Sequence, residues 1–363
     1  MPTSERAEPI PTAPWAREPG HPPQRFASAP ISLARLLADG QARNAATLAA
    51  HLQVDTAVLA ACLDQAEREY GLDLVRDTAG GYRLRAPLEL LDAATIHAAL
   101  PADGVPSALE IQDEVDSTNA WLLRAAARGA PDGACCLAEY QHAGRGRQGR
   151  AWVSPFGANL YLSLLWRAAG GPATFGRLSL AAGVAIVQAL DDCGARDLAL
   201  KWPNDIHWRQ RKLAGLLLEV GGAASGPSHA VLGVGVNLRL TPTQARAIDQ
   251  PWTDLQQVMS GTPPGRNRLA AALIARLLAM RARYLADGLA PFLDAWRRWD
   301  GYRGGAVVLS NGRERFAGHA LGIDDTGALL FAQPGQDVAR IQAGELSLRG
   351  VGETLSEELD SGI

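Results

Sequence analysis

The sequence has few cysteines and no arrangement of residues typical of a metal site. Four of its 363 residues are Cys. Cys62, Cys135, Cys136 and Cys193 show neither a CxxC spacing nor an accompanying pair of His residues. We therefore expect no metal site, and four unpaired thiols fit a reducing cytoplasm. The sequence also has no Ser-His-Asp order and no HExxH motif, so it indicates neither a nucleophilic triad nor a zinc hydrolase.

A strong net charge and a long apolar run are missing as well. The net charge is -3, so composition does not indicate a nucleic-acid or membrane binder, and such a role would need a local charged patch. No apolar run of transmembrane length is apparent, and the Pro-rich N-terminus with Glu5, Arg6 and Glu8 is not a signal peptide. We expect a cytoplasmic protein with no membrane association and with more than one buried core.

The N-terminal quarter divides into a tail, a small domain and a linker. Residues 1–29 are rich in Pro and Ala without periodicity, which predicts a disordered tail. Residues 30–86 contain three short helical patterns, the third with Asp55 as N-cap, and then a small hairpin. This order predicts a winged helix-turn-helix, with a helical packing domain as the alternative. Pro-punctuated residues 87–109 are expected to form a linker.

The remaining chain predicts an α+β domain followed by a small β-barrel. Within residues 110–300 helices alternate with strands, and the later strands follow one another through short turns. The central sheet is therefore expected to be mixed or antiparallel, which argues against a doubly wound fold. Residues 301–350 contain short strands, the last expected at Gln342–Ser347, and residues 351–363 are expected to form a loose tail.

One loop has the composition of an anion-binding site. Gly144–Arg150 has the sequence GRGRQGR, with three Gly and three Arg in seven residues. Glycine allows backbone N–H groups to approach an anion, and arginine supplies forked donors for phosphate or carboxylate oxygens. The loop matches neither a P-loop nor a dinucleotide-binding fingerprint. A triphosphate is the favoured ligand, and a solvated basic turn or a single-strand-binding segment are the alternatives.

A second segment predicts a lysine and a carboxylate on one face of a hairpin. The sequence KWPND at Lys201–Asp205 is followed closely by RKLAG at Arg211–Gly215. A two-residue turn at Arg209–Gln210 would pair His207 with Lys212 and bring Asp205 within one diagonal step. Alone, this could be a weak surface ion pair. Beside an Arg-Gly loop, the lysine could hold a substrate carboxylate near a phosphate.

Three further features are weaker. Ser117 or Thr118 is expected to cap a helix, and together with Asn119 they would leave hydroxyl and N–H groups for a polar ring. Asn237 ends a strand in GVGVN, and Trp152 follows the Arg-Gly loop, although such a Trp is more often a core residue. No enzyme nucleophile is indicated, so catalysis would depend on positioning and electrostatics.

Together these motifs resemble the biotin protein ligases of the bifunctional ligase/repressor type. The segments that match in order and spacing are Glu139–Gln141, Gly144–Arg150, Ser154–Leu160, Lys201–Asp205 and Arg211–Gly215. The match spans roughly residues 31–350, and the combination is far more specific than any single motif. The resemblance implies a class II synthetase-like central sheet and an SH3-like C-terminal barrel. It also implies two reactions: biotin and Mg²⁺-ATP form biotinyl-5′-AMP, and a lysine of the biotin carboxyl-carrier protein of acetyl-CoA carboxylase then takes the biotinyl group.

The resemblance also implies roles for individual residues. Lys212, Arg147 and Asp205 would be catalytic, with Lys212 holding the biotin carboxylate and the phosphate. The residues that would bind biotin are Ser117, Thr118, Asn119, Gln141, Arg145, Gly146, Arg147 and Lys212. The residues that would lie near the nucleotide are Trp152, Asn204, Asp205 and Asn237. The Arg-Gly loop would close over the acyl-adenylate and exclude water.

The sequence departs from the family's DNA-binding pattern. Phosphate contacts need basic or neutral polar donors, yet the third helical pattern has several acidic residues and one basic residue, Arg68. The wing supplies Arg76, Arg83 and Arg85. One hypothesis is a ligase whose N-terminal domain serves packing or dimerisation; the other is a ligase that also represses a biotin operon by binding operator DNA, as a homodimer. A lipoate-type ligase and a regulator without catalysis are the remaining alternatives.

Overall fold

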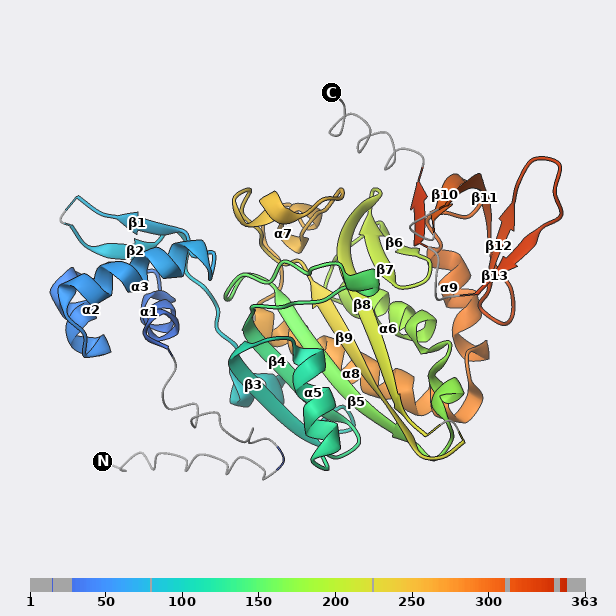
Figure 1. The fold of residues 1–363 in the computed structure, drawn as a ribbon, viewed down its shortest axis with the longest axis horizontal. Helices are drawn as coiled ribbons and strands as arrows, with labels where there is room; N and C mark the ends of the chain where they lie inside the picture. Colours follow the sequence, from blue (N-terminus) through green and yellow to red (C-terminus); the bar gives the residue numbers. More distant parts are fainter. Residues whose placement is uncertain are drawn as a thin grey trace.

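The computed structural model describes Trp15 and residues 28–78, 80–223, 225–310, 314–342 and 347–350. The predicted tails at 1–29 and 351–363 lie outside the described residues, except for Trp15, Ser28 and Ala29. Three groups of elements follow one another along the chain (Figure 1).

The first group is a three-helix unit with a small hairpin. Its elements are α1 (Ala29–Leu37), α2 (Ala45–Leu52), α3 (Thr56–Arg68), β1 (Leu74–Arg76) and β2 (Tyr82–Leu84). Apolar residues at helical spacing, among them Leu33, Leu37 and Leu59, form a core separate from that of the central sheet. The predicted cap of α3 is present, because Asp55 accepts a hydrogen bond of 2.8 Å from the Val58 N–H.

The second group is a seven-stranded mixed sheet with helices on both faces. Its strands are β3 (Ala108–Val115), β4 (Ala134–Gln141), β5 (Leu160–Ala168), β6 (Leu198–Lys201), β7 (Asp205–Trp208), β8 (Arg211–Gly222) and β9 (Ser228–Val236). They lie in the order β3-β4-β5-β9-β8-β7-β6, and only the β3–β4 pair of this sheet is parallel. The helices are α4 (Ala93–Ala99), α5 (Thr118–Ala127), α6 (Leu178–Asp192), α7 (Leu255–Val258), α8 (Arg266–Asp287) and α9 (Leu293–Trp299). This arrangement confirms the predicted mixed sheet.

Alternation along the strands assigns the helices to opposite faces. Leu165 and Val231 pack with α5, whereas their neighbours Leu164 and Leu232 belong to the core that contains α6 and α8. Gly215 and Gly233, which line the main cavity, lie on the α5 face. The helix α5 and the cavity therefore share one face of the sheet.

One helix of the central group is both long and apolar. Within the described residues, Pro172–Asp192 has the length and hydropathy of a membrane-spanning helix, and α2 and α3 qualify only as a pair bent by 92°. In Pro172–Asp192, 67% of the most apolar window is buried, because α6 packs between the sheet and α8. Its apolar character is explained by its place in the core.

The third group is a five-stranded antiparallel sheet near the C-terminus. Its strands are β10 (Ala306–Ser310), β11 (Arg315–Ile323), β12 (Leu329–Ala332), β13 (Ala339–Ile341) and β14 (Ser347–Gly350), in the order β13-β12-β11-β10-β14. The strand expected at Gln342–Ser347 is wrong at its start, because Gln342 follows the end of β13 and belongs to no strand. Residues 343–346 lie outside the described residues. Inward residues such as Val307 and Phe331 join the core of the central sheet.

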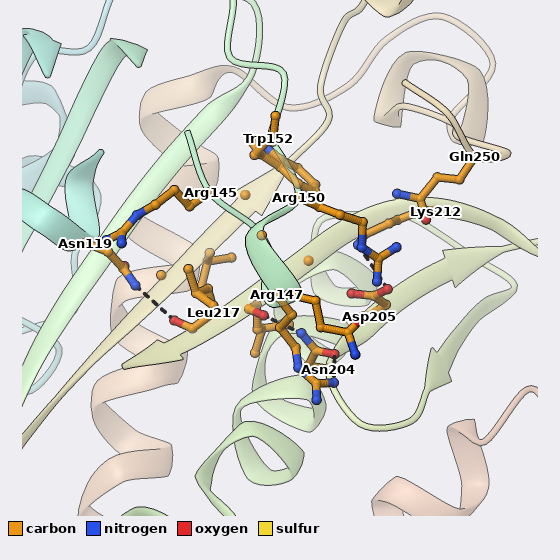
Figure 2. A pocket seen from close by; sticks show the side chains of 18 of the residues that line it. Asn119, Arg145, Arg147, Arg150, Trp152, Asn204, Asp205, Lys212, Leu217 and Gln250 are labelled. Carbon is orange, nitrogen blue, oxygen red and sulfur yellow. Dashed lines mark hydrogen bonds and ion pairs between the residues drawn. The ribbon is translucent and has the colours of Figure 1, made fainter. Parts of the chain in front are cut away.

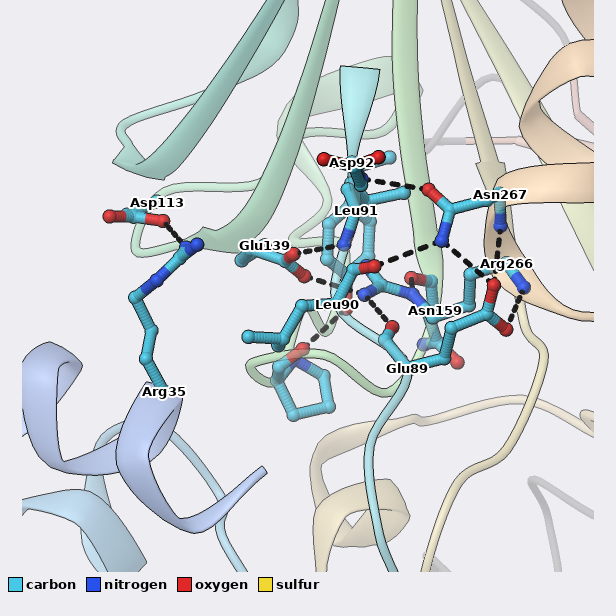
Figure 3. A network of polar contacts seen from close by, with 12 residues as sticks. Arg35, Glu89, Leu90, Leu91, Asp92, Asp113, Glu139, Asn159, Arg266 and Asn267 are labelled. Carbon is cyan, nitrogen blue, oxygen red and sulfur yellow. Dashed lines mark hydrogen bonds and ion pairs between the residues drawn. The ribbon is translucent and has the colours of Figure 1, made fainter. Parts of the chain in front are cut away.

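A buried polar network attaches the segment between the first two groups to the central sheet (Figure 3). Arg266 at the start of α8 forms a 2.6 Å ion pair with Glu139 of β4, and both side chains are at most 3% exposed. Glu89 accepts hydrogen bonds from the backbone N–H groups of Arg266 and Asn267. Because Glu139 lies two residues before Gln141, the network fixes the strand that leads into the cavity.

Candidate functional site

The main cavity lies over the middle of the central sheet, on the face that also holds α5. It encloses about 1130 Å³ including its open mouth. The cavity collects nearly all of the residues that the sequence predicts for a site: Ser117, Thr118, Asn119, Gln141, Arg145, Gly146, Arg147, Trp152, Asn204, Asp205 and Lys212. Figure 2 shows several of them converging from the Arg-Gly loop, α5 and the β6–β8 hairpins. Segments separated by about one hundred residues therefore meet in one place.

The floor of the cavity is made of glycines on neighbouring strands. A Cβ atom on Gly233 would lie 2.2 Å from Asn119 Oδ1, and one on Gly235 would lie 2.5 Å from the Trp152 ring. A Cβ on Gly215 would lie 3.1 Å from both Lys212 and Trp152. The absence of side chains here lets Asn119 and Trp152 lie directly on the sheet. In the sequence, the GVGVN motif indicated only a terminal amide, and this function of its glycines was missed.

One end of the cavity is built around the N-terminus of α5. Ser117 occupies the N-cap position without a side-chain cap bond, so the predicted capping role is not observed there. Gln141 accepts a hydrogen bond of 2.9 Å from the Thr118 N–H, and the Ser163 hydroxyl donates to Asn119 Oδ1 and lies 2.7 Å from the Thr118 hydroxyl. This end offers several oriented polar groups that are shielded from bulk water, as a polar ring would require.

The Arg-Gly loop forms a tight turn at the mouth of the cavity. The Gly146 N–H bonds to the Arg150 carbonyl at 2.7 Å, and Gln148 and Gly149 both have positive φ, +56° and +73°. Arg147 points inward and donates to Asn204 Oδ1 at 3.2 Å, and burial lowers its pKa from the usual value while leaving it a cation. The loop thus directs a fixed positive charge into the cavity.

The predicted hairpin with a lysine and a carboxylate on one face is confirmed. Arg209 and Gln210 form its left-handed turn, and His207 pairs with Lys212. A β-bulge follows, and Lys212 Nζ lies 3.0 Å from Asp205 Oδ2, with both side chains less than 20% exposed. Burial alone would raise the pKa of Asp205, but neighbouring cations, chiefly Lys212, bring it below the usual value. Lys212 therefore keeps a carboxylate partner until a ligand competes for it.

A second, smaller cavity adjoins the first across Trp152 and Lys212. Asn237, the one predicted residue absent from the main cavity, lines this cavity and donates to the Thr253 carbonyl at 3.1 Å. Its other walls are Ala247–Gln250 and Trp252, none of which was selected from the sequence. Backbone hydrogen bonds join Lys212 to Pro251 and Thr253, so the segment that forms these walls is held directly against the lysine. No motif marks the segment, and only its fold position brings it here.

Further residues of the main cavity were also missed. Lys201, only 7% exposed, lines its inner end with its ammonium 5.4 Å from the Tyr302 ring centroid. Arg150, Gln250 and Leu348 also line the cavity. Lys201 lies in the KWPND motif, but its residue type alone did not distinguish it from Lys212.

Comparisons with known proteins place the chain beside biotin ligases. A family model described as the biotin/lipoate A/B protein ligase family matches residues 112–237. The bifunctional ligase/repressor BirA of Salmonella typhimurium is 39% identical over 88% of this chain and 97% of its own length. A biotin–[acetyl-CoA-carboxylase] ligase of Paracoccus denitrificans is 38% identical over 60% of this chain and 92% of its own length. A solved biotin protein ligase of Aquifex aeolicus, in complex with biotin and ATP, matches with a TM-score of 0.57 and 26% identity over 67% of this chain and 99% of that chain.

Proposed function

Because the chain belongs to the biotin protein ligase family, we propose that it activates biotin with Mg²⁺-ATP and transfers the biotinyl group to a carrier-protein lysine. In the first step a carboxylate oxygen of biotin attacks the α-phosphorus, and pyrophosphate leaves. In the second step the lysine amine attacks the acyl carbon of biotinyl-5′-AMP, and AMP leaves. The proposed carrier is the biotin carboxyl-carrier protein of acetyl-CoA carboxylase, and the proposed location is the cytoplasm.

The observation that carries this proposal is the position of Lys212 between two cavities. It lies 3.0 Å from Asp205 and beside Trp152, at the junction of the main and the smaller cavity. An acyl-adenylate needs a cation at the bond between its two halves, since charge develops on the phosphoryl oxygens there. Lys212 and Arg147 are the proposed cations, with Asp205 orienting Lys212.

The two cavities suggest how the substrates divide. We place the ring of biotin at the α5 end, against Ser117, Thr118, Asn119 and Gln141, with Arg145 and Gly146 above it. The nucleotide would extend past Asn204 and Asp205, with its adenosine in the smaller cavity between Trp152 and Asn237. Mg²⁺ enters with the phosphates of ATP.

The test is turnover by the purified protein with biotin, ATP and Mg²⁺, with and without a carrier domain. We expect biotin-dependent pyrophosphate release and a biotin-sized mass gain on the carrier. Lys212→Ala should reduce pyrophosphate release by at least about 100-fold, the usual scale for removing a transition-state charge partner. Arg211→Ala, at the exposed neighbouring position, is the matched control and should stay within about twofold. Turnover with lipoate in place of biotin, or normal release by Lys212→Ala, would contradict the assignment.

We also propose that the predicted domains are functional units: a winged helix-turn-helix at 30–86, a linker at 87–109, the catalytic domain at 110–300 and an SH3-like barrel at 301–350. The separate core of the first unit supports its boundary, and the last unit is distinguished by its own five-stranded antiparallel sheet, although the two last units share one core.

A second role, repression through operator DNA, is favoured by one observation. The Salmonella relative named a bifunctional ligase/repressor aligns over 97% of its own length and 88% of this chain. The charges oppose it, because Arg68 on α3 pairs with Asp64 at 2.8 Å and Arg85 beside β2 pairs with Asp73 at 2.7 Å. A gel shift with the upstream DNA of its own gene at low salt, with biotin and ATP present, decides between repression and packing. Sedimentation under the same conditions tests the homodimer that paired half-sites would need.

A further inference from the structure

We infer that Glu219 is a positioning residue that holds the Arg-Gly loop over the biotin end of the cavity. This inference rests on the proposed ligase function for its consequence, but its geometry stands independently. Glu219 was not among the residues that the sequence indicated, and it lies on β8, far along the chain from both groups that it holds.

The position of Glu219 follows from strand alternation. Gly215 and Leu217 of β8 line the cavity, so Glu219, two residues further on, points to the same face. There its Oε2 atom accepts two hydrogen bonds, one of 2.9 Å from Asn119 Nδ2 and one of 3.0 Å from Arg145 Nη2. One carboxylate oxygen thus joins the floor of the cavity to the loop above it; Figure 2 shows Asn119 and Arg145 at this end.

The Asn119 side of this contact is rigid. Asn119 is 2% exposed, its Oδ1 accepts a 2.6 Å bond from Ser163, and its Nδ2 also donates to the Leu217 carbonyl at 3.2 Å. Gly233 beneath it makes room for this position, as a Cβ there would lie 2.2 Å from Asn119 Oδ1. Asn119 therefore serves as a fixed support, and the mobile partner in the contact is Arg145.

The Arg145 side can open. The side chains of Arg145 and Glu219 are 44% and 27% exposed, so water competes for the ion pair. Such a pair biases a loop toward one position by only a few-fold, whereas a buried pair would hold it shut. This strength suits a loop that must admit biotin and then retain a reactive product.

The consequence concerns water. When the loop is displaced, water can attack the acyl carbon of biotinyl-5′-AMP and release biotin and AMP, without any transfer to the carrier. A weaker contact between Glu219 and Arg145 should therefore raise the number of pyrophosphates released for each carrier biotinylated. If the role of Glu219 were purely structural, its loss would lower pyrophosphate release and carrier biotinylation together, and their ratio would stay the same.

The test compares Glu219→Gln with a matched control, Asp192→Asn. Glutamine keeps an oxygen for Asn119 but removes the charge that holds Arg145. Asp192 pairs with Arg276 between α6 and α8, on the opposite face of the sheet, at similar or greater exposure. The first readout is the initial rate of trypsin cleavage after Arg145, Arg147 and Arg150 in the full-length protein without substrates. We expect Glu219→Gln to raise that rate about two- to fivefold, the range that half-exposed ion pairs give, and the control to leave it unchanged.

The second readout is the ratio of pyrophosphate released to carrier biotinylated, which should rise in Glu219→Gln and rise further in Glu219→Ala. The inference would be overturned if neither Glu219 variant changed the cleavage rate. It would also be overturned if the ratio of pyrophosphate to biotinylated carrier stayed unchanged in these variants while the wild type was active. If Glu219→Gln folds poorly by circular dichroism, Glu219→Ala and the cleavage of its folded fraction provide the same comparison. Failure of the wild type to release pyrophosphate with biotin would refute the proposed function, while the cleavage assay would still decide on the loop contact.

Discussion

Removing Arg266 should destabilise the central sheet more than any exposed substitution, and the size of the loss can be worked from its contacts. Arg266→Met would leave Glu139 as a buried carboxylate with no cation, in a side chain that is 0% exposed. Breaking a buried pair in this way costs about 3–5 kcal/mol. The backbone carbonyls of Glu89 and Asn159 would lose their bonds of 2.8 and 3.0 Å to the guanidinium at the same time.

A second substitution separates the lost charge partner from the lost packing. In Arg266→Met with Glu139→Met, no unpaired charge remains, although the Leu91 N–H loses its acceptor, a loss of about 1–3 kcal/mol. The double variant should therefore be more stable than Arg266→Met alone. Urea unfolding followed by far-UV circular dichroism measures both. A loss below about 1 kcal/mol in the single variant, or a double variant less stable than the single, would refute the reasoning.

Two further predictions concern the site. Gly235→Ala would place a Cβ 2.5 Å from the Trp152 ring that separates the two cavities. We expect the KM for ATP to rise about tenfold or more (about 1.4 kcal/mol) with the fold retained. An unchanged KM would show that Trp152 does not contact the nucleotide. Burial, helped by the nearby Lys201, lowers the pKa of His207 to about 3. Between pH 6.5 and pH 3 the unfolded chain therefore binds more protons at this residue than the folded chain does, and the free energy of unfolding decreases as the pH falls. His207→Asn should flatten the dependence of the unfolding free energy on pH between 7 and 4.5, by up to about 1.4 kcal/mol per pH unit; parallel slopes for the two proteins would contradict the lowered pKa.

Local chemistry determined much of what the sequence could predict. The Asp55 cap, the turn at Arg209–Gln210 and the pairing of His207 with Lys212 depend on residues within a few positions of one another. Glycines and arginines in one loop, and a lysine opposite a carboxylate in one hairpin, indicated anion chemistry for the same local reason. The mixed character of the sheet followed from the short connections between its later strands.

The predictions that failed concern contacts between segments that are separate in the chain. Ser117 takes the N-cap position as predicted, but its side chain makes no cap bond, and the neighbouring Thr118 N–H bonds instead to Gln141 of β4. Strand boundaries near Gln342 depend on pairing with β12 and were misplaced.

Tertiary structure alone decided how these parts form a site. Strand alternation brings Gly215, Gly233 and Glu219 to one face, and no pattern within a single strand states which face will hold a cavity. The pairing β5-β9-β8 then places Glu219 beside Asn119, one hundred residues earlier in the chain, and the exit of β9 brings Trp252 against Lys212. By itself the sequence indicated which groups are chemically suited to a phosphate and a carboxylate, since residue type and close spacing fix that chemistry. Which distant side chains support those groups was set by the order and register of the strands, because contacts across a sheet depend on pairing between segments that share no local signal.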